Sequence, residues 1–174
     1  MADLKISQLT GATTPLAGTE VLPIVQSGTT KQVSVANLDT YRPAFSAFQN
    51  SAQSIPATTD TKLQFQAEEF DTNNNFDSTT NYRFTPTVAG YYQLTGGVRY
   101  SSGAATTYLS FLKNGTTSKR TSMPISSDQF YGSVLMYFNG TTDYVEMWVY
   151  ALGAATCDAT ASSTYFQGAL VRAA

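Results

Sequence analysis

Apolar and polar residues alternate with a period of two along most of the chain after Pro43. Between Tyr91 and Tyr100, one side of an extended segment would be apolar and the other mixed or polar. Side chains of a β-strand point alternately to opposite faces, so this pattern predicts a strand with one buried face. The apolar positions of this segment and of the later ones are Tyr92, Leu94, Gly96, Val98 and Tyr100, then Leu109 and Phe111, then Val134, Met136 and Phe138, then Val145, Met147 and Val149, then Phe166, Gly168 and Leu170. They predict a core built between sheets.

Turn signals separate these segments. Asn114-Gly115 and Asn139-Gly140 are dipeptides that tolerate positive φ, and we expect the second to join the strands on either side of it as a hairpin. Phe45 to Phe48 and Leu63 to Phe70 supply two earlier strands, and residues 71–80 form a polar loop. Roughly seven to ten short strands with a turn every 8 to 12 residues or so are typical of a sandwich or jelly roll.

The N-terminal part differs from the rest of the chain. All 11 Tyr, all 10 Phe and the single Trp lie at or after Tyr41. Before that residue, two extended pieces, Val21 to Gln26 and Lys31 to Val35, are separated by turns that contain Gly. A segment of about 40 residues without Cys or His does not form a stable core alone. We therefore expect residues 1–42 to fold on neighbouring copies or on a docking partner, and residues 43–174 to form a globular head.

Charge and cysteine content narrow the partners and the compartment. The net charge is −2, and the 10 Lys and Arg residues form no positive stripe, so we expect no nucleic-acid binding. Cys157 is the single cysteine, which excludes an intrachain disulfide and leaves packing or subunit association to hold the fold. The sequence has no apolar run long enough for a spanning helix and no signal-peptide start, so we expect no membrane insertion and synthesis in a cytoplasm.

Residues suited to catalysis are scarce. The chain has no histidine, which removes Ser-His and Cys-His nucleophiles, histidine metal ligands and a general base that titrates near neutrality. Glu68 and Glu69 are adjacent, so in a strand they point to opposite faces and do not make the paired carboxylates of a glycosidase. We expect no enzymatic activity, no catalytic residue and no cofactor.

Several of these positions coincide with a family pattern. The segments that carry it run from Phe84 to Tyr92, from Lys113 to Gly115, from Asp143 to Val145 and from Phe166 to Leu170. Through them, residues 43–174 resemble the head domain of the C1q/TNF family, and the matching positions are Phe84, Pro86, Gly90, Tyr92, Phe166, Gly168 and Leu170. The resemblance implies an all-β jelly-roll sandwich that forms a homotrimer and acts by recognition. A Gly-X-Y repeat is missing from the sequence, so we expect no collagen stalk.

A second resemblance concerns the N-terminal segment. Four stretches of this segment are similar to the leader by which bacteriophage tail fibres attach to the virion: Lys5 to Leu9, Gly18 to Gln26, Gly28 to Lys31 and Val33 to Leu38. The resemblance implies that residues 1–42 form a virion-attachment segment. Its partners would be other virion tail or baseplate proteins.

The strand expected after Asp143 is apolar or amphipathic on both faces, because Tyr144, Trp148 and Tyr150 lie opposite its core positions. Heads of the resembled family usually form a threefold bell with aromatic and apolar residues along the shared axis. We therefore take these three residues as candidates for the trimer interface. The alternative is that this second face packs under a loop or on a neighbouring edge within the same subunit.

Three long loops rich in small polar residues, 71–82, 116–130 and 152–163, are candidates for a receptor surface. Their exposed polar groups would suit a glycan or a protein, and the alternative is that they are solvated connections. Phe130 and Tyr131 would be the aromatic platform for a sugar, although core or subunit packing is the favoured role. The candidate receptor residues are Asn74, Asn75, Ser118, Ser127, Thr160 and Ser162.

Some heads of the resembled family bind calcium through loop carboxylates. Candidates here are Asp71, Asp77, Asp128 and Asp158, although their spacing does not match an EF-hand. The favoured role for such residues is to form turns by accepting hydrogen bonds from their own backbone.

The leading hypothesis is a phage virion protein, a short trimeric tail fibre or host-facing appendage. Its N-terminus would attach to the particle, and its head would adhere to a bacterial surface glycan or protein, with many copies combining weak contacts. One alternative is a purely structural capsid decoration or fibre adaptor protein without receptor binding. Another is a polysaccharide-degrading spike, which the absence of an evident acidic pair disfavours.

Overall fold

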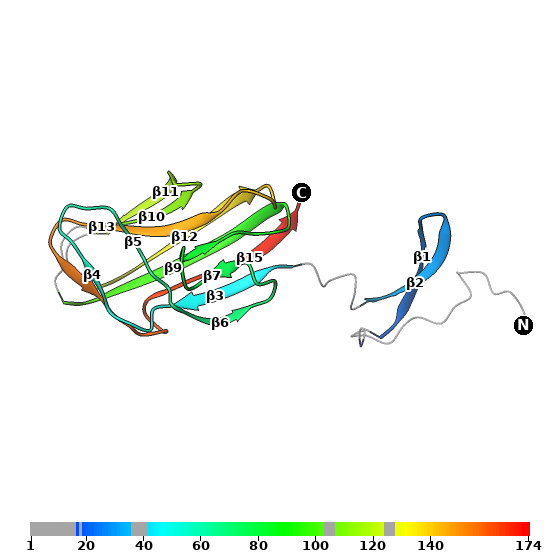
Figure 1. Ribbon diagram of the computed structural model, residues 1–174, viewed down its shortest axis with the longest axis horizontal. Helices are drawn as coiled ribbons and strands as arrows, with labels where there is room; N and C mark the ends of the chain where they lie inside the picture. Colours follow the sequence, from blue (N-terminus) through cyan, green and yellow to red (C-terminus); the bar gives the residue numbers. More distant parts are fainter. Residues whose placement is uncertain (1–16, 18, 36–41, 103–106, 124–127) are drawn as a thin grey trace, which may run out of the picture. The chain divides into compact units, whose positions relative to one another are not determined.

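The computed structural model describes residues 17, 19–35, 42–102, 107–123 and 128–174, and the side chains of 117, 118, 122 and 123 are not among the described parts. The chain divides into two compact units, Met1–Tyr41 and Arg42–Ala174. Figure 1 colours both units along the sequence and labels most of their strands. The second unit is called the head below.

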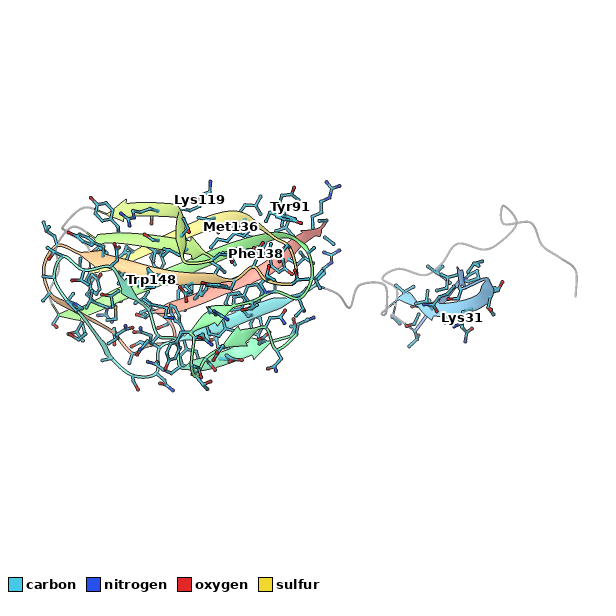
Figure 2. The ribbon with its side chains drawn as sticks, turned by 45° about the horizontal axis from the view of Figure 1, so that its top comes forward. Lys31, Tyr91, Lys119, Met136, Phe138 and Trp148 are labelled. Atoms are coloured by element: carbon cyan, nitrogen blue, oxygen red, sulfur yellow. The ribbon has the colours of Figure 1, made fainter. Side chains whose placement is uncertain are left out.

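The N-terminal unit contains a two-stranded antiparallel hairpin, β1 (Val21–Gln26) and β2 (Thr29–Ser34). Ser27 and Gly28 form its two-residue loop, and both have positive φ, as this tight turn requires. Every residue of β1 is exposed, including Leu22 and Val25, and Figure 2 shows side chains on both sides of this small sheet. A single hairpin is marginally stable in water, which supports the expectation that this segment folds on a partner.

The first sheet of the head is centred on the long strand β9 (Gly90–Ser102), and all its pairings are antiparallel. Residues 90–97 of β9 pair with two strands at once, so these two flank it on opposite edges. On one edge, β9 pairs with β12 (Gln129–Phe138). On the other edge follow, in order, β15 (Tyr165–Ala173), β3 (Ala44–Phe48) and β6 (Ala67–Asp71). Near the C-terminal end of β9, β14 (Ala155–Cys157) pairs with it, and β4 (Gln53–Ile55) pairs with β14.

The second sheet is also antiparallel, and β13 (Val145–Ala151) is its central strand. Its order is β11 (Thr116–Met123), β10 (Thr107–Lys113), β13, β8 (Arg83–Phe84) and β7 (Phe76–Asp77), and β5 (Thr61–Lys62) pairs with β13 as well. The described head thus has 13 strands, more than expected, because β5, β7 and β8 have two residues each.

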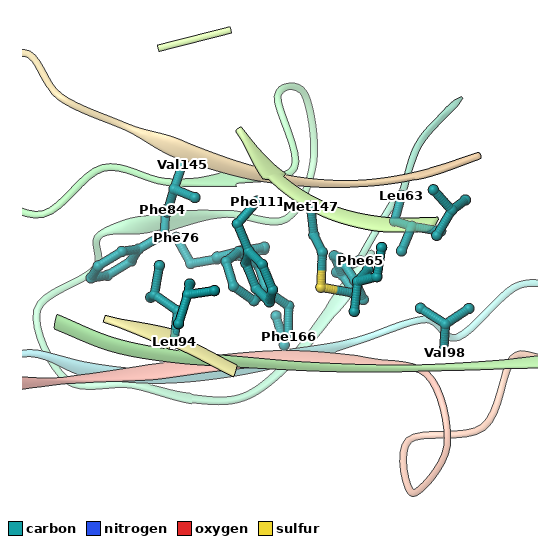
Figure 3. Packing of buried hydrophobic residues seen from close by; sticks show 14 of the residues in the cluster. Leu63, Phe65, Phe76, Phe84, Leu94, Val98, Phe111, Val145, Met147 and Phe166 are labelled. Atoms are coloured by element: carbon teal, nitrogen blue, oxygen red, sulfur yellow. The ribbon is translucent and has the colours of Figure 1, made fainter. Parts of the chain in front are cut away.

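The core lies between the two sheets. Figure 3 shows Phe111, Val145 and Met147 reaching from the second sheet toward Leu94 and Phe166 of the first. The ring of Phe166 is fully buried and lies in contact with several other rings; those within about 6 Å by centroid are Phe45, Phe65, Phe76 and Phe111. The predicted apolar faces are confirmed, since these positions are buried on every strand apart from a partly exposed Gly168.

The seven positions that match the family pattern are structural. Phe84 stacks on Phe45 at 4.2 Å between ring centroids, and the hydroxyl of buried Tyr92 donates to the carbonyl of Val88 at 2.8 Å. Gly90 begins β9 where the backbone of β15 passes so closely that a Cβ would collide with the carbonyl oxygen of Arg172. These contacts show that Phe84, Gly90 and Tyr92 specify the packing of the head.

The turn predicted at Asn114-Gly115 is confirmed, and the hairpin predicted at Asn139-Gly140 is wrong. Asn114 and Gly115 both have positive φ and close a two-residue loop between β10 and β11. The segment around Asn139-Gly140 also turns, but β12 pairs with β9 of the first sheet and β13 pairs with β10 of the second. This connection crosses from one sheet to the other, because each of its strands finds its partner in a remote part of the chain.

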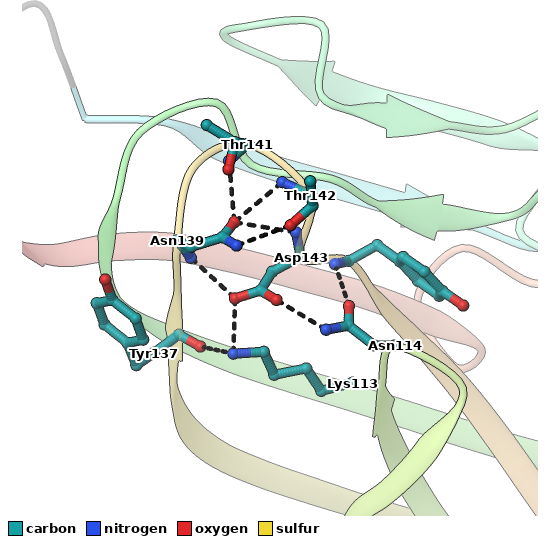
Figure 4. Close-up of polar contacts among 8 residues, drawn as sticks. Lys113, Asn114, Tyr137, Asn139, Thr141, Thr142 and Asp143 are labelled. Carbon is teal, nitrogen blue, oxygen red and sulfur yellow. Dashed lines mark hydrogen bonds and ion pairs between the residues drawn. The ribbon is translucent and has the colours of Figure 1, made fainter.

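A network of hydrogen bonds holds this crossover connection (Figure 4). The carboxylate of Asp143 accepts hydrogen bonds from Lys113 Nζ at 2.7 Å, from the Asn114 side-chain amide at 2.7 Å and from the Asn139 backbone at 2.9 Å. Lys113 Nζ also donates to the carbonyl of Tyr137 at 2.7 Å. The network joins the β10–β11 turn to the β12–β13 connection, and we call it the Asp143 clasp.

Candidate functional site

The three residues expected at a trimer interface lie on the outer side of the second sheet, opposite its core residues, and each is half-buried. Each also has a partner within its own chain. Trp148 donates from Nε1 to Glu146 at 3.0 Å, Tyr144 lies under the guanidinium of Arg83 at 4.3 Å, and Tyr150 packs on Tyr108. Their role in assembly stays a prediction, but this surface is already covered in part by the subunit itself.

The first sheet presents a far more apolar outer face. Tyr91, Tyr131, Leu135 and Tyr137 are 45%, 50%, 52% and 43% exposed. We call the outer side of strands β12, β9 and β15 the β12 face. Tyr137 lies opposite Tyr91 in the register, with ring centroids 5.5 Å apart, so the two rings form one exposed aromatic pair. Figure 2 shows Tyr91 and Trp148 in separate parts of the head.

The opposite end of the β12 face is also aromatic. Tyr131 and Tyr165 both lie opposite Gly97, and their rings approach to 6.4 Å between centroids across it. A Cβ on Gly97 would come within 3.0 Å of both rings. The glycine therefore lets the two tyrosines close over β9 and form a continuous surface. Phe130, which precedes Tyr131 in the sequence, is buried, so only Tyr131 remains of the aromatic platform suggested for Phe130 and Tyr131.

Between its aromatic ends, the β12 face carries polar side chains beside Leu135. The side-chain amide of Gln93 donates to Ser133 Oγ at 2.7 Å, and Thr95 Oγ1 lies 3.0 Å from the same oxygen. Gln167 continues this row onto β15. The β12 face therefore combines exposed apolar side chains with hydrogen bonds fixed within the sheet, and protein interfaces contain both kinds of group.

A shallow hollow of about 250 Å³ lies on the same sheet beside the β12 face. Phe70, which is 50% exposed, and the buried Phe45 contribute apolar surface to it. The wall of the hollow on β9 and β15 is formed by Gln93, Gln167 and Ala169. The sheet thus carries exposed bulky side chains on β12 and a recess that begins on the neighbouring strand β9 and extends to Phe70 on β6.

The candidate receptor residues are not brought together as one surface. Asn74, Thr160 and Ser162 are exposed, but Asn75 is buried. Its Nδ2 donates to the Asn73 carbonyl at 3.0 Å, and its Oδ1 lies 3.3 Å from two donors of Thr87. A surface role for Asn75 is therefore wrong, because the loop uses its amide to satisfy its own backbone. Ser127 lies outside the described residues, as does the side chain of Ser118.

The four calcium candidates each have partners within the chain. Asp71 accepts from the backbone of Asn73 and Phe76, and Asp158 and Asp128 approach Arg99 at 3.1 and 3.5 Å. In the described ranges, no three acidic, cysteine or histidine side chains come close enough together to hold a metal ion.

Asp77 is the clearest turn-forming residue of this set. The backbone N–H of Thr80 donates to its carboxylate at 2.9 Å, and those of Thr79 and Asn81 add two more hydrogen bonds. The Thr80 bond has the largest effect, and together these donors outweigh the effect of burial and hold the pKa of Asp77 well below its usual range. The carboxylate is already engaged by the loop that it shapes.

Sequence reasoning missed the β12 face, although a signal for it was present. Tyr131, Leu135 and Tyr137 alternate with the core positions of β12, so this strand is apolar on both sides. The same argument that selected Tyr144 and Trp148 applies to it. The difference lies in burial, since only the fold shows which second face remains uncovered.

Comparisons of the structure with solved structures identify the fold. Murine APRIL matches with a TM-score of 0.60 and 11% identity, over 75% of this chain and 99% of that chain. Vertex protein P5 of PRD1 matches with a TM-score of 0.58 and 18% identity, over 75% and 97%. The globular domain of the zebrafish complement 1qA protein matches with a TM-score of 0.53 and 15% identity, over 76% and 99%.

These similarities confirm the expected all-β jelly roll of the C1q/TNF type for the head. At these identities the similarity concerns the fold alone. No known protein family matches the sequence, and no curated protein sequence matches it. In the described part of the chain, no helix has the length and apolar character needed to cross a membrane.

Proposed function

We propose that this chain is a homotrimeric structural protein of a virion, attached through residues 1–42, whose head adheres to the host surface. The β12 face carries this proposal. Four large apolar side chains, each more than two-fifths exposed, lie on one side of one sheet. Tyr91, Leu135 and Tyr137 lie together at one end of this face, and an exposed apolar cluster of this kind marks a site of protein association.

The occupant of this face is a second copy of the same chain. The bulky side chains of β12 and the hollow beside Phe70 lie at different places on the same sheet. An interface that joins two different patches is heterologous, and its repetition gives a ring where the rotation between copies closes. A ring of three would place three β12 faces around one axis, which agrees with the trimer that the resemblance implies.

The N-terminal unit supports the attachment part of the proposal. Its hairpin exposes Val21, Leu22, Ile24 and Val25. The chain enters the head at Pro43, whose carbonyl accepts a hydrogen bond from Leu170 near the C-terminus. The loops at the opposite end of β3 and β15 are thus directed away from the point where the attachment segment joins the head. Such an arrangement suits a protein held at one end and presented at the other.

The resemblance of the leader to tail-fibre segments supports a host-facing position on a phage particle. The fold similarity to a PRD1 vertex protein agrees with a virion role. An adhesive head needs no catalytic centre, because three heads on each appendage and many appendages on a particle combine weak contacts into stable attachment.

The substitution Leu135→Asp on β12 tests the assembly. An unpaired carboxylate at an apolar interface costs about 3 kcal/mol or more, which weakens each contact by roughly 100-fold. Sedimentation equilibrium of the full chain should give three times the 18.8 kDa monomer mass, and Leu135→Asp should sediment as a monomer. The matched control is Leu152→Asp, at a leucine of similar exposure on the other side of the head. A trimer that survives Leu135→Asp would refute the assignment of the interface to the β12 face.

Adhesion is tested by adding fluorescent full-length protein to a panel of bacterial strains. Saturable binding of the trimer to particular strains supports the adhesin. A trimer that binds no strain would instead indicate the purely structural alternative, a decoration or fibre adaptor protein.

A further inference from the structure

The outer side of the second sheet carries a groove of about 410 Å³. It is lined by Asp60, Tyr108, Arg120, Tyr150 and Leu152. Tyr108, Arg120 and Tyr150 come from β10, β11 and β13, respectively. Asp60 directly precedes β5 and Leu152 directly follows β13, so the groove runs across the sheet. Its volume lies within the range of small-molecule sites, about 300 to 1,000 Å³.

Two tyrosines form the aromatic part of the groove. Tyr108 and Tyr150 are directly opposite each other in the β10–β13 register, with ring centroids 5.8 Å apart and planes inclined by 46°. Their strand neighbours Leu109 and Val149 point into the core and are fully buried. The rings therefore stand on a rigid base, and they are half-buried with part of their surface open to solvent. Tyrosine provides an apolar ring face together with a polar hydroxyl.

Arg120 forms the polar part. Its Nε donates to Ser110 Oγ at 2.9 Å, its Cζ lies 5.4 Å from the Tyr108 ring centroid, and an Nη lies 3.4 Å from Asp60. Ser110 is buried, so the first of these contacts fixes the base of the guanidinium. The ion pair with Asp60 is long, and both side chains are about half exposed, which makes it weak in water. A guanidinium has five donor N–H groups, and these two hydrogen bonds use two of them.

We propose that this groove binds neutral hexose units of a bacterial surface glycan, an inference that rests on the adhesive function proposed above. A sugar hydroxyl both donates and accepts. Neighbouring hydroxyls can therefore bridge the carboxylate of Asp60 and the guanidinium of Arg120. The apolar C–H face of the same ring can pack on Tyr108 and Tyr150.

The charge of the groove selects against acidic ligands. The one arginine that lines it is paired with an aspartate, so the lining residues have no net charge. A uronate or a phosphate would be attracted by Arg120 but repelled by Asp60, and among the described residues no second cation lines the groove. Leu152, which is 54% exposed, adds apolar surface at the edge and favours the uncharged face of a sugar ring.

The groove and the β12 face lie on different sheets, so both can function in the same molecule. A trimer would carry three grooves on its outer surface. A single open groove of this size would bind weakly, and the three together would give the avidity that attachment to a polysaccharide needs.

The test uses the full-length protein, a panel of purified neutral hexose polysaccharides and hexuronate polysaccharides on a surface, and the strains of the cell-binding assay. Tyr150→Ala should reduce binding to both a neutral polysaccharide and the cells by at least about tenfold, which corresponds to roughly 1.4 kcal/mol per contact. Tyr150→Phe, which keeps the ring, should retain binding. Tyr144→Ala is the matched control, because it removes a tyrosine next to β13 but outside the groove.

Sedimentation and thermal unfolding of each variant confirm that the trimer and the fold are intact, and Tyr150→Phe distinguishes loss of a ring from loss of the fold. If Tyr150→Ala and Arg120→Ala bind cells as well as the wild type, the groove is not the receptor site, while the adhesive function stands. Binding only to hexuronates would overturn the neutral class. If the wild type binds neither cells nor any polysaccharide, both proposals fail.

Discussion

Replacing Asp143 by Ala tests whether the clasp stabilises the crossover between the two sheets. The carboxylate accepts from Lys113 Nζ and the Asn114 amide at 2.7 Å each and from the Asn139 N–H at 2.9 Å. Its side chain is 10% exposed. Alanine would leave three donors without their acceptor at the point where β12 ends and β13 begins.

The expected loss follows from these contacts. A hydrogen bond to a charged group contributes about 1.5 to 3 kcal/mol, and breaking a buried ion pair costs about 3 to 5 kcal/mol. Water reaches Lys113, whose side chain is 26% exposed, and Asn114, which is exposed, so part of the loss is recovered by hydration. We therefore expect the free energy of unfolding to fall by about 3 kcal/mol, or Tm by about 10 °C for a head of this size.

Urea unfolding at fixed protein concentration measures this loss, since the stability of an oligomer depends on concentration. The matched control is Asp128→Ala, which removes an exposed carboxylate paired with Arg99 at 3.5 Å and should cost less than about 0.5 kcal/mol. Equal losses in the two variants would refute the role assigned to the clasp.

The pH dependence of the free energy of unfolding provides a second test of the Asp143 clasp. Burial alone would raise the pKa of Asp143, but the hydrogen bonds from Lys113, Asn114 and Asn139 outweigh it and hold that pKa below its ordinary value. A lowered pKa in the folded state adds stability above the unfolded pKa of about 3.9, and this stability is lost as the pH falls through the folded value. The difference between wild type and Asp143→Asn should therefore be full at neutral pH and shrink below about pH 4.

Two further predictions concern single positions of the head. Gly140→Ala should lower the free energy of unfolding by more than about 1 kcal/mol, because Gly140 has a φ of 71° and a Cβ would collide with the backbone N of Ala89. An unchanged midpoint of urea unfolding would contradict this prediction. Cys157 is fully buried, and burial raises the pKa of its thiol to about 12, so a thiol reagent at pH 8 should react at least about tenfold faster in urea than in buffer. Equal rates under the two conditions would show that the thiol is accessible.

Alternation along the chain was sufficient to predict which side chains of the head are buried. Because successive side chains of a strand point to opposite faces, positions such as Leu94, Phe111 and Phe166 could be assigned to the core from the sequence. Asn114-Gly115 likewise predicted its turn, because the conformation of a two-residue loop depends on those two residues. Local geometry determines both features.

Strand pairing could not be predicted in the same way. The sequence around Asn139-Gly140 has the turn residues of a hairpin, yet its two strands belong to different sheets. Pairing depends on contacts with segments far along the chain, such as β9 and β10, and a local turn is compatible with either outcome.

The surfaces required the fold for the same reason. Both β12 and β13 are apolar on two sides, and only the tertiary structure shows that Trp148 is partly covered while Leu135 is exposed. The groove likewise joins Asp60, Arg120 and Tyr150, which lie far apart in the sequence. The sequence by itself determined the buried face of each strand through its period of two. Which second faces are open, and which remote side chains meet there, was decided only when long-range pairing assembled the two sheets.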